Sequence, residues 1–488
     1  MPKLESLIFD NSFARLPESF YTRLCPTPVP SPYLVSRSPA ALELLGLDEA
    51  EAQRSEFVEA FAGNHLLPGM EPLAAVYAGH QFGHYVSQLG DGRAILLGEV
   101  KNAAGEGWEI QLKGSGRTPY SRSGDGRAVL RSSIREFLCS EAMHALGIPT
   151  TRALCIVGSD LPVYREEEET AALVTRLAPS FVRFGSFEVF FYRNQIEPIR
   201  QLADYVIARY YPELAALADP YPEFLRQVMM RTAELMAQWQ AVGFSHGVMN
   251  TDNMSILGLT LDYGPFGFME AYDPGYICNH SDEFGRYAFD QQPDVAAWNL
   301  TRLAQALTPL MSVEAAHAAI ADYPSLYARR YMERMAAKLG LPPDSTSARL
   351  VLDIRQLLEQ NHVDYTIFLR RLCGFDSAEN ASNTPLRDLF LDRPAFDAWA
   401  ARYGATLRQY NSQDSERARA MRQLNAKYIL RNHLAEVAIR RAADHRDYSE
   451  LRRLHELLSR PYDEQPEFDE YAREPPEWAR QIEVSCSS

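Results

Sequence analysis

One loop in the middle of the chain carries residue types that can hold a metal ion. It reads Ser245-His246-Gly247-Val248-Met249-Asn250-Thr251-Asp252-Asn253, and Asp262-Tyr263-Gly264 follows nine residues after Asn253. Amide and carboxylate oxygens are the ligands that hard cations such as Mg²⁺ and Mn²⁺ prefer. The pattern therefore favours a metal site at Asn253 and Asp262. An ordinary polar loop is the alternative, because the same residue types also favour turns.

The spacing of this loop follows the protein-kinase pattern H-R-D-L-x-x-x-N, with one departure. Asn253 lies seven residues after His246, and Asp262 takes the place of the D-F-G aspartate. Val248, however, stands where a kinase has the aspartate that orients the substrate hydroxyl, so ordinary γ-phosphoryl transfer has lost its base. Asp252 is the nearest carboxylate that can accept a proton. Its alternative role is only to turn the loop.

Basic residues gather in the first half of the chain. Lys113 ends an expected strand, and Glu136 follows 23 residues later in an expected helix, the order in which kinases pair a strand lysine with a helix glutamate. Arg176 and Arg183 lie in and just after an apolar strand, and fixed guanidinium groups suit phosphate oxygens. Alternatively, the lysine and Glu136 are solvated, and the arginines pair with the acidic tract 166–169.

Two glycine-rich stretches accompany these charges. Gly90-Asp91-Gly92-Arg93 lies between the expected strands 84–88 and 94–100, where glycines let backbone N–H groups approach a phosphate closely. Asp125-Gly126-Arg127 belongs to a second such stretch. A simple hairpin turn is the alternative for Gly90 and Gly92.

Hydrophobic periodicity predicts an α+β chain with two lobes. Expected strands cover 84–88, 94–100, 108–113, 153–157 and 171–177, and expected helices cover 39–45, 131–146, 196–217, 221–242, 293–307, 312–339, 346–372 and 413–457. We divide the chain into an N-terminal arm (1–60), a small β-rich lobe (61–190), a large helical lobe with the catalytic and metal loops (191–330), and a C-terminal helical extension and tail (331–488).

Composition narrows the class of protein. The chain has 488 residues, of which 46% are hydrophobic and 23% charged, as in a globular protein. Its 49 basic and 64 acidic residues give a net charge of −15, so nucleic acid is not an expected partner. The sequence predicts neither a membrane span nor a signal peptide, and we expect a cytoplasmic monomer. The six cysteines show no zinc or disulfide pattern.

The complete set of motifs resembles the selenoprotein O family over essentially the whole chain. The matching segments are Gly90-Asp91-Gly92-Arg93, Lys113-Gly114-Ser115-Gly116, Asn250-Thr251-Asp252-Asn253-Met254, Asp262-Tyr263-Gly264-Pro265 and the terminal Cys486-Ser487-Ser488. Cys486 holds the position of the selenocysteine of animal members. The resemblance implies a pseudokinase fold, like a bilobal protein kinase, that binds ATP in an inverted orientation. It also implies transfer of AMP from ATP to Ser, Thr or Tyr hydroxyls of proteins.

The resemblance assigns roles to single residues. Contacts to the nucleotide are implied for Gly90, Gly92, Arg93, Asp125, Gly126 and Asp262; binding of the β and γ phosphates for Lys113, Arg176 and Arg183; metal binding for Asn253 and Asp262; proton acceptance for Asp252; and orientation of Lys113 for Glu136. Inversion of ATP would explain the cations of the small lobe, because they would neutralise departing pyrophosphate. The co-substrate would be ATP with Mg²⁺ or Mn²⁺.

Other interpretations stay open. Uridylyl transfer from UTP with Mn²⁺ is one, because the sequence identifies no residue that would recognise the nucleotide base. A small-molecule kinase of the aminoglycoside-phosphotransferase kind is another, although Val248 argues against it. A third is a silent nucleotide-binding scaffold, which would not need a complete metal site. Separately, Cys278 follows the metal motif, and we hypothesise a regulatory disulfide between Cys278 and Cys486; two unrelated thiols are the alternative.

Overall fold

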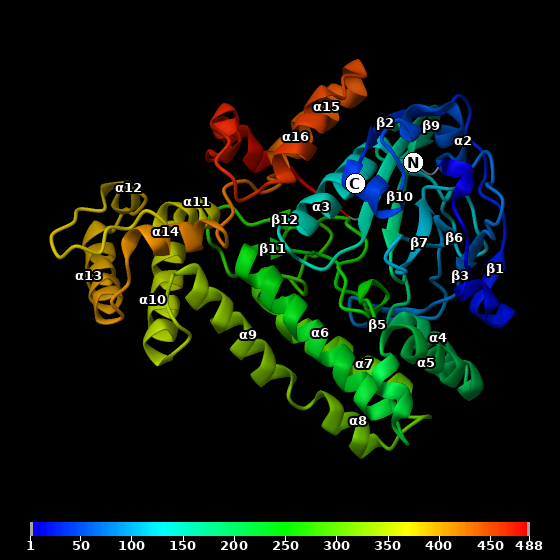
Figure 1. Ribbon diagram of the computed structural model, residues 1–488, viewed down its shortest axis with the longest axis horizontal. Helices are drawn as coiled ribbons and strands as arrows, with labels where there is room; N and C mark the ends of the chain where they lie inside the picture. The colour runs from blue at the N-terminus through cyan, green and yellow to red at the C-terminus, as the bar shows by residue number, and fades with distance from the viewer. Residues whose placement is uncertain (1–2, 486–488) are drawn as a thin grey trace.

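An antiparallel sheet organises the first part of the chain in this computed structural model, which describes residues 3–485 (Figure 1). Within those residues the sheet has eight strands, with β1-β3-β6-β7-β10-β9-β2 in spatial order and β8 paired to β10. The strands are β1 (Tyr21–Arg23), β2 (Tyr33–Arg37), β3 (Leu73–Ala75), β6 (Ala94–Lys101), β7 (Gly107–Lys113), β8 (Ala128–Val129), β9 (Arg152–Tyr164) and β10 (Glu168–Ala178). Helices follow, so the α+β class is confirmed.

Both faces of the sheet are covered. The central strands are buried along nearly their whole length, as expected when neither face meets water. Helix α3 (Leu130–Ala145) packs against β9 and β10, while α1 (Pro39–Leu44) and α2 (Ser55–Phe61) pack against β9. The predicted hairpin of β9 and β10, with acidic residues at its tip, is confirmed by their antiparallel pairing.

The first sixty residues, expected as an arm, supply strands to the sheet. β1 pairs with β3 and β2 pairs with β9, so this segment forms both ends of the strand order. Its side chains also enter the buried apolar cluster that contains Phe57, Phe61 and Ile110. These edge strands pair with strands that are distant in sequence, and hydrophobic periodicity alone does not reveal such partners.

The expected hairpin between residues 84–88 and 94–100 is wrong. β5 (His84–Val86) pairs with β4 (Gly79–Gln81) in a separate hairpin, and β6 pairs with β7 instead. The turn of this hairpin is Phe82-Gly83, whose φ angles of +49° and +83° are both positive. Two-residue turns in which both residues have a positive φ close tight antiparallel hairpins. The chain therefore turns back before it reaches Gly90.

The helices after the sheet are α4 (Gly185–Tyr192), α5 (Ile196–Tyr210), α6 (Tyr221–Val242), α7 (Gln292–Leu307), α8 (Val313–Ile320), α9 (Tyr323–Lys338), α10 (Ser345–Asn361), α11 (Tyr365–Leu372), α12 (Thr384–Arg387), α13 (Arg393–Gln409), α14 (Asp414–Arg422), α15 (Asn432–His445) and α16 (Ser449–Leu458). The prediction of 221–242 is confirmed to the residue. The helices expected over 312–339 and 346–372 are each divided in two. Among the residues described here, no helix is long and apolar enough to cross a membrane.

The division of the second predicted helix has a clear local cause. His362 adopts a positive φ of +50° after α10, and Asp364 then caps α11 by accepting the Ile367 N–H at 2.9 Å. α13 was not predicted, although Phe396, Trp399, Tyr403 and Leu407 recur at helical spacing and are buried. Together α9–α13 build an apolar cluster away from the sheet, at the left of Figure 1.

The last helices return to the β-rich part. α15 and α16 pack on α3, and the Phe137 and His455 rings lie 5.0 Å apart. A buried ion pair fixes the entry to α15, because Arg431 donates to Asp364 at 2.8 Å with side chains 2% and 6% exposed. In Figure 1, α15 and α16 lie above α3.

We predict that Arg431→Ala lowers the free energy of unfolding by about 3–5 kcal/mol, because it leaves the buried Asp364 carboxylate without its cation. Arg446→Ala is the matched control. Arg446 also meets its partner, Asp160, at 2.8 Å, but these side chains are 66% and 54% exposed, and such pairs contribute about 0–1 kcal/mol. Urea unfolding of both variants measures the difference, and equal losses would contradict the prediction.

Candidate active site

Asp262 is the centre of the site, because cations from three segments converge on its carboxylate. Oδ1 accepts hydrogen bonds from Arg176 and, at 3.3 Å, from Lys113 Nζ, and Oδ2 accepts one from Arg183 at 2.8 Å. Burial opposes ionisation of Asp262, but the charges of Arg176, Lys113 and Arg183 hold the pKa of this carboxyl well below its usual range. Asp262 is therefore a carboxylate at neutral pH.

Glu136 of α3 completes this cluster. Its carboxylate meets Lys113 at 2.6 Å and Arg176 at 3.1 Å, and all three side chains are less than 10% exposed. Burial lowers the pKa of Lys113, while the charges of Glu136 and Asp262 oppose that effect. Among the described residues, three cations thus face two carboxylates. The excess is positive, and the cluster suits an anionic ligand.

The register of the sheet explains why these groups meet. Gln111 of β7 lies opposite Arg176 of β10, and Lys113 lies opposite Val174. Alternate residues of a strand share a face, so Gln111, Lys113 and Arg176 point the same way. α3 covers that face and places Glu136 against them. Gln111 Oε1 accepts a further hydrogen bond from Arg176, which fixes the guanidinium.

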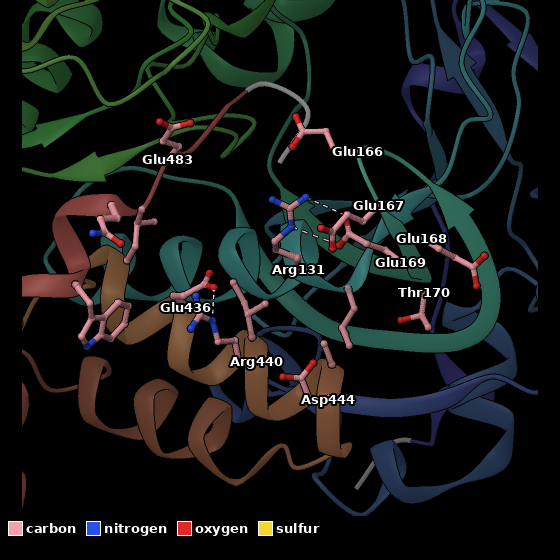
Figure 2. A pocket seen from close by; sticks show the side chains of 16 residues that line it. Arg131, Glu166, Glu167, Glu168, Glu169, Thr170, Glu436, Arg440, Asp444 and Glu483 are labelled. Atoms are coloured by element: carbon pink, nitrogen blue, oxygen red, sulfur yellow. Dashed lines mark hydrogen bonds and ion pairs between the residues drawn. The ribbon is translucent and has the colours of Figure 1, made fainter.

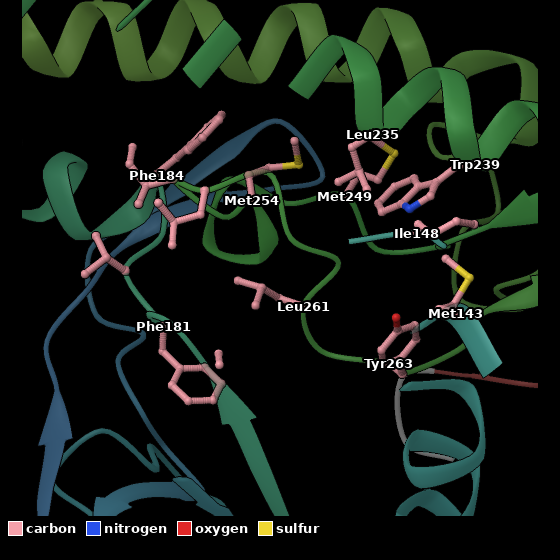
Figure 3. Packing of buried hydrophobic residues seen from close by; sticks show 14 of the residues in the cluster. Met143, Ile148, Phe181, Phe184, Leu235, Trp239, Met249, Met254, Leu261 and Tyr263 are labelled. Carbon is pink, nitrogen blue, oxygen red and sulfur yellow. The ribbon is translucent and has the colours of Figure 1, made fainter. Parts of the chain in front are cut away.

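Apolar packing holds the loop that carries Asp262. Figure 3 shows Met249, Met254, Leu261 and Tyr263 among buried side chains that include Trp239 of α6. His246 stacks on Trp239 with ring centroids 5.3 Å apart and lies within hydrogen-bond distance of the Leu261 carbonyl, 2.8 Å from Nε2. Burial lowers the pKa of His246, so the ring is neutral and donates to that carbonyl. His246 therefore acts as a structural link to the residue before Asp262.

Asp252 lies under the β4–β5 hairpin. The His80 N–H donates to Thr251 Oγ1 at 2.7 Å, and Gln81 Nε2 donates to Asp252 Oδ2 at 3.2 Å. The other carboxylate oxygen, Oδ1, is buried and has no hydrogen-bond partner within residues 3–485. Burial raises the pKa of Asp252 to about 7, although the nearby charge of Arg183 opposes the rise. A carboxylate of this kind is suited to proton transfer near neutral pH.

Asn253 keeps an oxygen available for a metal. Its side-chain N–H₂ donates to the Val248 carbonyl at 2.9 Å, which fixes the orientation of the amide. An amide oxygen at Asn253 and a carboxylate at Asp262 are donor types that suit Mg²⁺ or Mn²⁺, although both Asp262 oxygens already accept from Lys113, Arg176 or Arg183. No cluster of three or more His, Cys, Asp or Glu suited to a metal occurs in the described part of the chain. A metal held here would depend on substrate phosphates for further ligands.

Close contacts with Tyr120 explain why residues 90 and 92 are glycines. A Cβ on Gly90 would lie 2.5 Å from the Tyr120 ring, and one on Gly92 would lie 2.8 Å from the Tyr120 carbonyl oxygen. Thr118 Oγ1 also donates to the Asp91 carbonyl at 2.7 Å. These contacts fold the segment around Tyr120 over the glycine turn. Arg93, next in sequence, lies close enough to Lys113 for its charge to lower the lysine pKa, an effect smaller than that of burial.

Gly126 reaches the same region, because its carbonyl accepts from the Gly116 N–H at 2.9 Å and a Cβ on Gly126 would lie 2.1 Å from the Gly116 oxygen. Gly116 follows Lys113 by three residues. The Asp125 carboxylate instead binds Arg165 at 2.8 Å, at the turn between β9 and β10. Backbone atoms of 125–126 are therefore near the site, while the Asp125 charge is already paired.

The alternative pairing of Arg176 and Arg183 with the acidic tract 166–169 is wrong. Glu169 pairs with Arg131 of α3 at 2.8 Å, as Figure 2 shows, whereas Arg176 and Arg183 turn to Asp262. The tract lines a separate cavity with α15 and the segment 478–483.

Cys278 is buried against the loop 245–253. Its Sγ donates to the Ser245 carbonyl at 3.4 Å, and burial raises the pKa of this thiol to about 12. The His280 N–H, two residues on, donates to the Val484 carbonyl at 2.8 Å. Cys486 lies outside the described residues. The disulfide therefore stays a prediction, which counting free thiols by mass after oxidation would test.

Sequence reasoning gave no role to three polar residues that orient the cluster: Asp91, which lies within a quoted motif, and Gln111 and Gln81, which lie outside the motifs. Asp91 is buried and accepts from Gln111 Nε2 at 3.3 Å, and Gln111 in turn binds Arg176. Gln81 reaches Asp252 from the hairpin that was not predicted. The alternation of β7 gave a signal for Gln111, which shares a face with Lys113, but nothing in the sequence indicated Gln81.

Comparison with known proteins gives a consistent result. The family model described as protein adenylyltransferase SelO matches residues 3–459. The chain is 76% identical to a protein nucleotidyltransferase YdiU of Thiobacillus denitrificans over 488 residues, the full length of both chains. It is 56% and 53% identical to proteins of the same name from Myxococcus xanthus and Pseudomonas fluorescens, again over 100% of each chain.

We predict that Asp262→Asn lowers the stability of the nucleotide-free protein by about 1–3 kcal/mol, because Lys113, Arg176 and Arg183 lose the charge that they share. Tripolyphosphate added without divalent metal should then raise the thermal unfolding midpoint more than it does for the wild type. Asp160→Asn, at an exposed ion pair, is the control. An Asp262→Asn midpoint equal to the wild type, with the same tripolyphosphate response, would contradict the prediction.

Proposed function

Because the chain belongs to the protein adenylyltransferase SelO family, we propose that it transfers AMP from ATP to Ser, Thr or Tyr hydroxyls of proteins. The observation that carries the proposal is the convergence of Lys113, Arg176 and Arg183 on Asp262, in a loop where Val248 replaces the kinase base. Because these cations are buried, they favour a triphosphate whose β and γ phosphates point toward the interior of the protein. We propose with it a kinase-like arrangement of the β-rich and helical parts.

In this proposal the chain holds ATP through its own fixed groups. Lys113, Arg176 and Arg183 bind the β and γ phosphates, and Glu136 keeps Lys113 in place through the 2.6 Å ion pair. The nucleotide also meets the glycine turn Gly90–Arg93 and the backbone of Asp125–Gly126. Cationic groups fixed before the substrate arrives stabilise the charge of the departing pyrophosphate without reorganising.

Asn253 and Asp262 are the residues that would hold Mg²⁺ or Mn²⁺. The metal, when bound, draws negative charge from phosphate oxygens and makes the phosphorus more electrophilic. Asp262 is suited to this role because the surrounding cations keep its carboxylate ionised. Asn253 is suited to it because its amide is already oriented by the Val248 carbonyl.

Asp252 is the proton acceptor of the proposal. The oxygen of the acceptor hydroxyl forms a bond to the α-phosphorus, the bond from that phosphorus to the bridging oxygen of pyrophosphate breaks, and the hydroxyl proton passes to Asp252. The unpartnered Oδ1 of Asp252 provides the lone pair. Gln81 holds the other oxygen and so fixes the carboxylate plane.

A decisive experiment compares two labels. We expect the purified full-length chain with Mg²⁺ to attach label to protein from ATP labelled at the α-phosphorus and not from ATP labelled at the γ-phosphorus. Label from the γ position alone would restore a kinase and overturn the proposal. Label from α-labelled UTP with Mn²⁺, in greater amount than from ATP, would replace adenylyl by uridylyl transfer. Absence of label with ATP bound would favour the scaffold.

The pKa of Asp252 gives a pH prediction. Below about 7 the carboxyl is protonated and cannot accept a proton, so the rate of transfer should rise with pH through about 7 and then level. Asp252→Asn should lower the rate on the order of 10²–10⁴-fold and remove that inflection. ATP affinity, measured separately, should be retained. An Asp252→Asn variant with the wild-type pH profile would refute the role of Asp252.

A further inference from the structure

A solvent-open cavity of about 470 Å³ lies beside the catalytic loop, and no step proposed above uses it. Its walls include Phe82 of the β4–β5 turn, Phe284 and Arg286 of the loop before α7, and Asp294, Val295 and Trp298 of α7. We call this cavity the acceptor groove. It is separate from the cluster around Asp262, since none of its lining residues belongs to that cluster.

Phe82, which lines the groove, directly follows Gln81, which contacts the proposed base Asp252. The Phe82 N–H donates to Asn250 Oδ1 at 3.2 Å, and the preceding residue, Gln81, donates to Asp252. Tyr287 OH also donates to Asn250 Oδ1, at 2.5 Å, which ties the loop after Phe284 to the catalytic loop. Phe82 therefore connects a wall of the groove, through the neighbouring Gln81, to the hairpin that contacts Asp252.

The groove presents aromatic surface that the fold does not use. The Phe284 side chain is 95% exposed and that of Phe82 is 37% exposed. Arg286 lies over the Trp298 ring, 4.8 Å from its centroid, and the absence of a side chain on Gly83 leaves room for the guanidinium. Large exposed aromatic groups at the edge of a concavity are typical of binding anchors, because they bury apolar area when a partner arrives.

The charges around the groove favour a basic partner. Asp294 is exposed in its wall, and the neighbouring Glu283 and Asp290 are exposed as well. The Asp282 carboxylate is occupied, since it accepts the Arg286 and Tyr287 N–H groups at 3.0 and 2.7 Å. The guanidinium groups of Arg286 and Arg302 both lie over the Trp298 ring, 4.8 and 5.1 Å from its centroid, and Arg286 forms no ion pair within the part of the chain that the structure describes. Three exposed carboxylates, of Glu283, Asp290 and Asp294, thus outnumber the two guanidinium groups, and charge complementarity points to Lys or Arg.

We propose that the acceptor groove docks the segment of the protein substrate that flanks the modified hydroxyl. It takes one large apolar or aromatic side chain against the exposed Phe82 and Phe284 rings, and a Lys or Arg beside it against Asp294. This inference rests on the proposed function, because it assigns the groove to the protein that receives AMP. The groove thus selects acceptor sites by sequence, while the Asp262 cluster handles ATP.

The test uses the full-length chain, labelled ATP and synthetic peptides. Each peptide has one central Tyr in an Ala background, with Phe or Ala at one flanking position and Lys or Glu next to it. We expect one flanking position at which Phe raises kcat/KM about tenfold or more over Ala, in line with burial of an aromatic side chain. At the adjacent position Lys should be preferred to Glu.

Two variants locate the preference. Phe284→Ala should remove most of the advantage of Phe, and Asp294→Lys should reverse the preference for Lys over Glu, both with unchanged ATP affinity. The matched controls are Leu391→Ala, which removes an apolar side chain that is 88% exposed but distant in the fold, and Glu379→Lys at another exposed acidic residue. Both controls should keep the wild-type preferences.

The outcomes separate the two proposals. Transfer of α-label without any sequence preference, or a preference that survives in both variants, overturns the groove and leaves adenylyl transfer standing. Failure to label any peptide, while a protein acceptor is labelled from the α position, also overturns the groove as a docking site for such segments. Transfer of γ-label in place of α-label overturns adenylyl transfer, and the peptide preferences then still report on the groove.

Discussion

The arrangement of the site depends on neutralising the positive charges that it buries. Lys113, Arg176 and Arg183 are each less than 10% exposed, and an isolated charge at such a position would be costly. Asp262 and Glu136 neutralise only part of this charge. The fold therefore keeps a buried positive excess, which a triphosphate can neutralise. Strand β7, strand β10, helix α3 and the loop at 262 are all constrained by these contacts, because a shift of any one of them would separate a charge from its partner.

The same constraint separates two chemical tasks. Lys113 and Arg176 of the sheet, with Arg183 after it, bind the Asp262 carboxylate, while Gln81 of the β4–β5 hairpin binds that of Asp252. Burial then acts differently on the two carboxyls. Neighbouring cations keep Asp262 ionised, whereas Asp252 is left with one partner at one oxygen and a pKa close to neutrality. One loop thus supplies a permanent anion and a group able to exchange a proton.

Local patterns in the sequence revealed most helices and the motif loop. The spacing from His246 to Asn253 and the helix over 221–242 depend on residues close in the chain, so periodicity and motif reading predicted them. The pairing of β1 and β2 with distant strands, and the turn at Phe82-Gly83, depend on tertiary contacts or on a positive φ that propensity does not show. The contacts of Gln81 with Asp252 and of Asp91 with Gln111 were not predicted for that reason, because the partners lie far apart in sequence.

The packing of α3 has a consequence for how activity can be controlled. This helix has the sheet on one side and α15 and α16 on another, and Phe137 lies against His455. Swinging α3 outward to withdraw Glu136 would open an apolar core and strand Lys113 without its partner. The packing of α15 and α16 on α3 therefore helps to hold Glu136 in its ion pair with Lys113. We therefore do not expect an outward movement of α3 to control activity, which leaves substrate access and the hypothesised Cys278–Cys486 disulfide.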